Sequence, residues 1–146
     1  MGKHSLSEAL QTRDGSQVAL VPRIQRHAAA IEQISDLAVW SDPEAIARAL
    51  RNAQSLYSLD AVTLGDTYTI AVACRQASSP GLGPLEALTQ SKDGTPLFEL
   101  PSPESVITTP VLSVYLEACR RIQTVLGDRA GIAILLPDHQ ALRDQL

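Results

Sequence analysis

The sequence predicts an α/β fold with about three parallel strands and flanking helices. Three short apolar runs, at residues 18–21, 59–64 and 130–136, predict the strands. Between them lie stretches whose apolar residues recur at helical spacing. Apolar strands that alternate with amphipathic helices are typical of a parallel sheet, because parallel neighbours need a crossover connection that is usually a helix.

The N-terminal part predicts a helix, a turn, a strand and a second helix. Residues 5–12 form a polar-apolar helical pattern, and residues 13–16 have the composition of a turn. The wholly apolar run at 18–21 ends at Pro22 and is typical of a strand buried on both faces. From Ile24 onward a helix is predicted, with a face made of Ile24, Ala28, Ile31 and Ile34.

A helix start is predicted at residues 41–44. Ser41 is the expected cap, Pro43 falls in the first turn, and Glu44 follows three residues after Ser41. The helical spacing of apolar residues then continues to Tyr57. The predicted strand at 59–64 comes next and ends at the dipeptide Gly65-Asp66.

The middle of the chain is less regular. Residues 67–75 fit either a strand or a helix, whereas residues 76–96 are rich in Ser, Pro and Gly and predict a long loop around a short helix at 84–89. Loops of that length in compact domains are usually functional or mobile. A short extended piece at 97–100 and a turn at 101–104 are expected to follow.

Pro110 opens a further predicted helix that ends at Gly127. Its apolar stripe consists of Val111, Tyr115, Cys119 with Ala118, Ile122 and Leu126. The strand at 130–136 and a helix at 138–145 complete the pattern. The turns that follow the strands are expected at the carboxyl edge of the sheet, where parallel sheets carry their binding sites.

Composition limits the classes of function. The chain has 146 residues, 45% of them hydrophobic, which suits a single domain with a real core. A net charge of -4 argues against nucleic-acid binding, because phosphate contacts need a basic face. Cys74 and Cys119 are expected to be free thiols, and neither a metal nor a cofactor is expected. Without a signal peptide or an apolar run of about 20 residues, a cytoplasmic protein is expected.

Four segments resemble, in the same order, the N-terminal part of uroporphyrinogen decarboxylases and of the related corrinoid-dependent methyltransferases. They are residues 10–15, 59–66, 96–106 and 131–137. The resemblance implies a (β/α)8 barrel of which this chain holds about the first three strands. A complete barrel needs about 250 residues.

The resemblance also suggests site residues. Arg26, and more loosely Arg23, match the arginines that meet the acidic side chains of the porphyrinogen. Asp66 matches the aspartate that holds pyrrole N–H groups and stabilises a cationic intermediate. The family's glycine beside the second arginine is replaced here, and the strand before Asp66 is one residue shorter, as in the methyltransferase branch. Each candidate also has a structural interpretation. Asp66 would then belong to an ordinary turn after a strand, and Arg26 would be an exposed arginine at a helix end. His27 falls on the apolar side of its helix and would be a structural histidine rather than a base.

Two classes of function follow from the resemblance. In the first, the chain is a non-catalytic binding or assembly module that lacks the C-terminal part of the barrel and associates through an exposed apolar sheet face, for example as a homodimer. In the second, it is one part of a carboxy-lyase or methyltransferase that a second chain completes. The expected partners are another copy or such a chain, with a tetrapyrrole or a corrinoid protein as possible ligand, and neither nucleic acid nor membrane.

Overall fold

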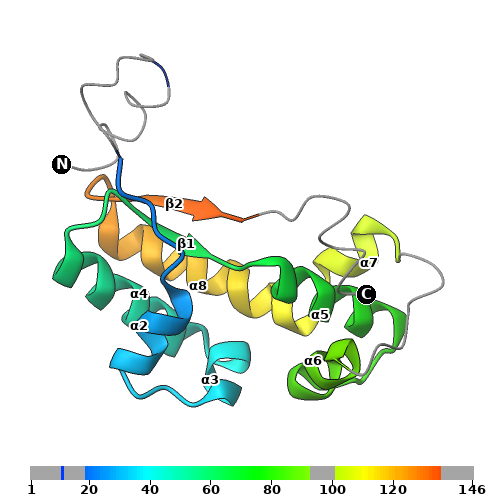
Figure 1. Cartoon of the computed structure of the whole chain (residues 1–146). Helices are drawn as coiled ribbons and strands as arrows, with labels where there is room; N and C mark the ends of the chain where they lie inside the picture. Colours follow the sequence, from blue (N-terminus) through cyan, green and yellow to red (C-terminus); the bar gives the residue numbers. More distant parts are fainter. Residues whose placement is uncertain (1–10, 12–18, 93–100, 136–146) are drawn as a thin grey trace.

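The computed structural model of the chain describes residue 11 and residues 19–92 and 101–135. Its helices and strands, in chain order, are α2 (Gln25–Ile31), α3 (Asp36–Ser41), α4 (Pro43–Tyr57), β1 (Ala61–Leu64), α5 (Thr67–Ser78), α6 (Pro84–Lys92), α7 (Pro103–Ile107), α8 (Pro110–Leu126) and β2 (Gly131–Ile134). Figure 1 shows α4 and α8 running beneath the two strands, with α5, α6 and α7 beyond the carboxyl end of β1.

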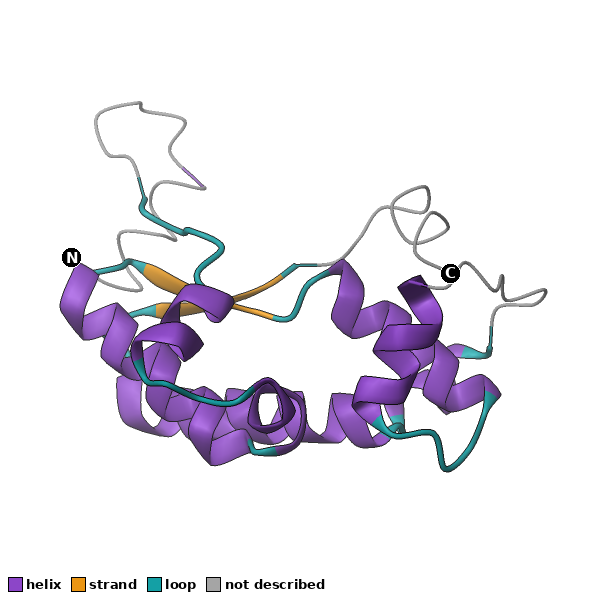
Figure 2. Cartoon of the chain, turned by 60° about the horizontal axis from the view of Figure 1, so that its bottom comes forward, coloured by secondary structure: helices purple, strands orange, loops and turns teal. Residues whose placement is uncertain are grey.

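The described residues are mostly helical and contain a small parallel sheet. β1 and β2 pair with Ala61 opposite Gly131 and Leu64 opposite Ile134. In both views the helices lie on one side of this sheet (Figures 1 and 2). This arrangement agrees with the α/β class and with the strands predicted at 59–64 and 130–136.

The strand predicted at 18–21 is wrong for the residues that the structure describes. Residues 19–22 run beside β1 without forming a regular ladder. Leu20 exchanges bonds with Asp60, whose backbone N–H donates to the Leu20 carbonyl at 3.2 Å and whose carboxylate accepts from the Leu20 N–H at 2.9 Å. Pro22 has no N–H to continue the pairing. The Thr63 hydroxyl instead donates to the Pro22 carbonyl at 2.9 Å.

The start of α4 differs from its prediction by one residue. Asp42, not Ser41, is the N-cap, and its carboxylate accepts the backbone N–H groups of Glu44 and Ala45 at 2.9 and 3.1 Å. Ser41 is the last residue of α3, and its hydroxyl donates to the Leu37 carbonyl. An aspartate directly before a proline at the first helical position satisfies the N–H groups that a helix start leaves free.

Within the described residues 76–92, the loop predicted at 76–96 is shorter than expected, and the short helix predicted inside it at 84–89 is confirmed as α6. α5 continues to Ser78 and α6 spans Pro84–Lys92, so only residues 79–83 lie between these two helices. Gln76 stabilises the end of α5 because its amide donates to the Leu82 carbonyl at 3.0 Å and accepts from the Val111 N–H at 3.2 Å. The residues from 67 onward, which fitted either a strand or a helix, form α5.

Prolines begin four of the described helices. Pro43 is the first residue of α4, Pro84 of α6, Pro103 of α7 and Pro110 of α8. The turn predicted at 101–104 is therefore the start of α7, which Ser102 caps by accepting the Ser105 N–H. Proline suits this position because the first turn of a helix needs no hydrogen bond from its N–H groups.

The core lies between the helices and the sheet. The stripe predicted on α8 is confirmed, with Val111, Tyr115, Ala118, Ile122 and Leu126 buried and Cys119 partly buried. All four residues of β1 are at most 2% exposed, whereas Ile134 at the end of β2 is 57% exposed. The apolar sheet face that the sequence analysis expected to be exposed is thus buried at β1 within this one chain.

Some predictions fall outside the described residues. They are the helix at 138–145, the extended piece at 97–100, the turn at 13–16 and nearly all of the helix at 5–12. Across the part of the chain that the structure describes, no helix has the length and apolarity needed to cross a membrane.

Candidate functional site

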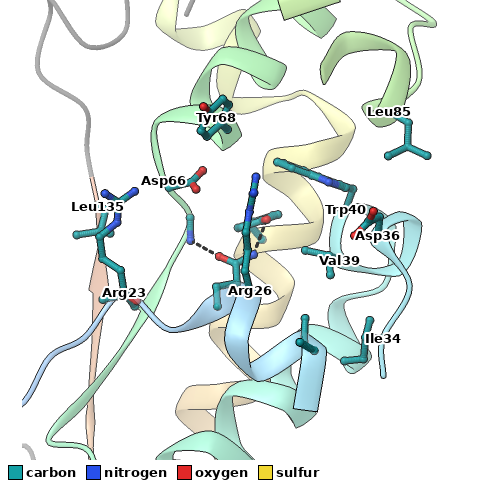
Figure 3. A pocket seen from close by; sticks show the side chains of 16 residues that line it. Arg23, Arg26, Ile34, Asp36, Val39, Trp40, Asp66, Tyr68, Leu85 and Leu135 are labelled. Carbon is teal, nitrogen blue, oxygen red and sulfur yellow. Dashed lines mark hydrogen bonds between the residues drawn. The ribbon is translucent and has the colours of Figure 1, made fainter. Parts of the chain in front are cut away.

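A pocket with a volume of about 590 Å³ opens at the carboxyl end of β1. The three residues proposed from the sequence, Arg23, Arg26 and Asp66, all line it. Arg23 and Arg26 come from the start of α2 and the segment before it, and Asp66 from the turn between β1 and α5 (Figure 3). The pocket has the size of a typical small-molecule site and lies at the sheet edge where the sequence placed it.

Asp66 has a structural role as the N-cap of α5. Its Oδ1 accepts the Thr69 N–H at 3.0 Å and the Thr69 hydroxyl at 3.2 Å, and its own N–H donates to Thr69 Oγ1 at 3.2 Å. Among the described residues, no hydrogen bond is formed with Oδ2 and no cation pairs with the carboxylate. Asp66 thus belongs to the turn after β1, caps the helix that follows, and also lines the pocket.

Arg23 and Arg26 are exposed cations at the pocket. Among the described residues neither forms an ion pair, whereas Arg48, Arg120 and Arg121 each pair with a glutamate. Arg26 projects between Tyr68 and Trp40 (Figure 3), with its guanidinium carbon 5.6 Å from the centre of the Tyr68 ring. Such a contact holds the guanidinium in place and leaves its N–H groups available to an anion.

Gln25 connects the two sides of the pocket. Its Oε1 accepts the Gly65 N–H at 3.0 Å, and its Nε2 donates to the Tyr115 hydroxyl at 2.6 Å. It thereby joins the start of α2 to the turn before Asp66 and to the middle of α8. Nothing in the local sequence pattern distinguishes Gln25 from a surface glutamine, so the sequence gives no signal of this role.

Aromatic rings form much of the remaining wall. The whole chain has one Trp, three Tyr and one Phe, and three of these five residues, Trp40, Tyr68 and Tyr115, line the pocket. The Trp40 and Tyr115 rings lie 6.2 Å apart, tilted by 39°. Burial is the main reason why the pKa of Tyr115 is raised, so its hydroxyl is neutral at physiological pH. Only the scarcity of aromatic residues in the sequence could have pointed to this cluster.

The other candidate groups lie elsewhere. His27 is exposed rather than on the apolar side of α2, and its Nε2 is 2.8 Å from the Tyr57 hydroxyl. Cys74 and Cys119 are free thiols, as expected. Within the described ranges, no group of three or more His, Cys, Asp or Glu residues is placed to hold a metal ion.

The geometry therefore combines two arginines without ion-pair partners among the described residues, two carboxylates (Asp36 and Asp66) and aromatic surfaces. No protein-family model, curated protein or solved structure matches this chain. The resemblance to uroporphyrinogen decarboxylases and corrinoid-dependent methyltransferases thus stays a prediction, and any function rests on the pocket itself.

Proposed function

We propose that this chain is a non-catalytic binding module whose pocket takes a ligand that carries carboxylates and flat rings. The observation that supports this most directly is the presence of two arginines without ion-pair partners among the described residues, in one pocket with three aromatic rings. Arginine binds carboxylates through a planar fork of N–H donors, and aromatic walls favour flat apolar surfaces.

The position of Asp66 adds a preference for ligands that carry N–H donors as well. Its Oδ2 has no hydrogen bond within the described residues, while Oδ1 is held by Thr69. A carboxylate held rigidly at a pocket wall accepts N–H groups without having to reorganise. An acidic tetrapyrrole has flat rings, carboxylates and N–H groups together, which is the ligand that the family resemblance implies.

A titration with uroporphyrinogen, kept reduced, tests the proposal. Trp40 is the only tryptophan of the chain and lines the pocket, so its fluorescence should change as the ligand binds. Arg26→Gln should weaken binding about 10- to 100-fold, the size expected for one hydrogen bond to a charged group. Asp66→Asn should also weaken it, while keeping the cap because asparagine caps helices as well as aspartate does.

Two controls make the titration specific. Arg48→Gln removes an arginine of similar exposure on α4, away from this pocket, and should leave binding unchanged. Uroporphyrinogen with its carboxylates methylated should bind much more weakly than the free acid. Equal binding of the ester, or no binding of the acid to the unmodified chain, would refute the proposed recognition of carboxylates.

A second candidate function is that of one part of a tetrapyrrole decarboxylase or corrinoid methyltransferase, completed by another chain. Three segments run side by side in chain order: residues 19–24, β1 and β2. The β1 segment lies in the middle and forms hydrogen bonds with residues 19–24 on one side and with β2 on the other. That order agrees with the opening of a (β/α)8 barrel. The exposed Ile134 at the end of β2 offers apolar area for association, with a second copy or with a partner chain.

Two measurements bear on the two candidates: the mass of the protein in solution shows whether the chain self-associates, and a decarboxylase assay with and without a second protein separates the binding module from the enzyme part. Light scattering on the eluting peak of a sizing column gives that mass directly. A monomer that binds the tetrapyrrole supports the binding module, and a homodimer is compatible with it. Decarboxylase activity that appears only when a second protein is added would favour the enzyme part.

A further inference from the structure

We infer that Gln25 is the positioning residue of the pocket, which holds Arg26 and Asp66 in a fixed relation to each other. This inference rests on the proposed binding function but concerns a residue of the pocket wall whose amide is already bound to the protein at both ends. Gln25 precedes Arg26 directly, and its amide oxygen binds the backbone N–H of Gly65, the residue before Asp66. The two residues proposed to face the ligand are thus connected through the Gln25 side chain.

The second bond of Gln25 makes this connection rigid. Its Nε2 donates to the hydroxyl of Tyr115, which is 5% exposed and packs against Trp40. A side chain with one bond can rotate about it, whereas bonds at both ends of the amide fix its orientation. Residues 25, 65 and 115 belong to three different segments, so the amide links α2, the turn after β1 and α8.

The turn itself needs such support. Gly65 has a φ of +76°, a conformation that glycine adopts without strain and that permits alternative turn geometries. A Cβ at this position would lie 3.7 Å from the Tyr115 ring, so the turn packs closely against α8. The bond from Gly65 to Gln25 selects one geometry of this turn, and with it the direction in which Asp66 points.

Gln25→Met tests this role, because methionine has a similar length and no hydrogen-bonding amide. We expect uroporphyrinogen to bind about tenfold more weakly, the result of losing two ordinary hydrogen bonds that align the site. The Gly65 amide hydrogen should exchange faster with solvent in the absence of any ligand. Tyr115→Phe, which removes one of the two bonds, should give a smaller change of the same kind.

Gln76→Met is the matched control. Gln76 also makes two hydrogen bonds that join three segments, and it is 4% exposed, but it does not line the pocket. Loss of the Gln76 amide should lower the stability of the fold. The exchange rate of the Gly65 amide hydrogen and the affinity for uroporphyrinogen should both stay as in the unmodified chain. Gln54→Met is a second control. It removes a single hydrogen bond, to the Leu59 carbonyl, so it should destabilise the fold less than Gln76→Met does.

The ligand-free measurement separates this inference from the proposed function. If Gly65 exchange is unchanged in both Gln25→Met and Tyr115→Phe, Gln25 does not position the turn, whatever the affinity. If exchange rises in these variants and no form of the chain binds uroporphyrinogen, the positioning role stands and the proposed ligand is wrong. If Gln76→Met weakens binding as much as Gln25→Met, the effect is general destabilisation and the inference fails.

Discussion

Asp66 and Thr69 bind each other reciprocally at the start of α5. The Asp66 carboxylate accepts the Thr69 N–H at 3.0 Å, and the Asp66 N–H donates to the Thr69 hydroxyl at 3.2 Å. This capping box fixes the carboxylate at the wall of the pocket, so one side chain serves both helix stability and the site. The two roles can be separated, because the cap uses Oδ1 whereas the proposed contact with ligand N–H groups uses Oδ2, which asparagine would replace with a donor.

Asp66→Ala should lower the free energy of unfolding by about 1 kcal/mol, the usual cost of losing an N-cap. Asp66→Asn should cost clearly less, since its amide oxygen can accept the same bonds. Urea unfolding followed by circular dichroism measures both values. Equal destabilisation by the two variants would mean that the carboxylate's charge, rather than its oxygen, stabilises the helix.

The same pair of substitutions at Asp42 provides the comparison. Asp42 caps α4 through the N–H groups of Glu44 and Ala45 and does not line the pocket at β1. Asp42→Ala should therefore lower stability by a similar amount, about 1 kcal/mol, and leave binding of uroporphyrinogen unchanged.

Leu50→Ala should destabilise the fold strongly. Leu50 lies in the middle of α4 and is 0% exposed, so the change leaves a cavity in the core. Core leucines replaced by alanine typically cost about 2–5 kcal/mol. Leu56 lies on the same helix but is 62% exposed, and Leu56→Ala should change stability by less than about 0.5 kcal/mol. Similar losses in chemical denaturation at both positions would contradict the packing described above.

The two thiols should react slowly in the folded protein. Burial raises the pKa of both Cys74 and Cys119, which lowers the fraction of reactive thiolate at neutral pH. Cys119 is only partly buried and should react with a disulfide reagent before Cys74. The reagent releases a coloured thiol as it reacts, so absorbance gives the reaction rates of Cys119 and Cys74. Unfolding the protein in urea should make the two rates equal. Fast reaction of Cys74 under native conditions would show that α5 opens readily.

Stability should fall as the pH rises above about 10. Burial raises the pKa of Tyr115 above its ordinary value of 10.0, so the unfolded state loses this proton first. The contribution of the protonated Tyr115 hydroxyl to the free energy of unfolding is complete below pH 10. It is lost as the pH rises through the pKa that Tyr115 has in the folded protein. Urea midpoints measured at pH 9 and pH 11 report this loss. It should be smaller in Tyr115→Phe and unchanged in Tyr57→Phe, whose ring is 42% exposed.

Local sequence signals predicted most helices but not all of their boundaries. The stripe on α8 and its end at Gly127 follow from periodicity and from a glycine at the cap. The loop predicted at 76–96 from its serines, prolines and glycines is shorter than expected, because α5 continues to Ser78 and α6 to Lys92, whereas the helix predicted at 84–89 is confirmed. There Gln76 binds both Leu82 and Val111, contacts that no local pattern reveals. Pro84 begins a helix because its missing N–H is not needed at that position.

The sequence by itself determined the apolar stripes of the helices and the positions of the strands at 59–64 and 130–136, because backbone sterics and side-chain periodicity act over a few residues. It also placed Asp66 at the end of a strand and Arg26 at the start of a helix. Only the tertiary structure decided that these residues share a pocket with Trp40 and Tyr115. The Gln25 bonds that bring them together span 40 and 90 positions, so they depend on how α2, β1 and α8 pack rather than on any local preference.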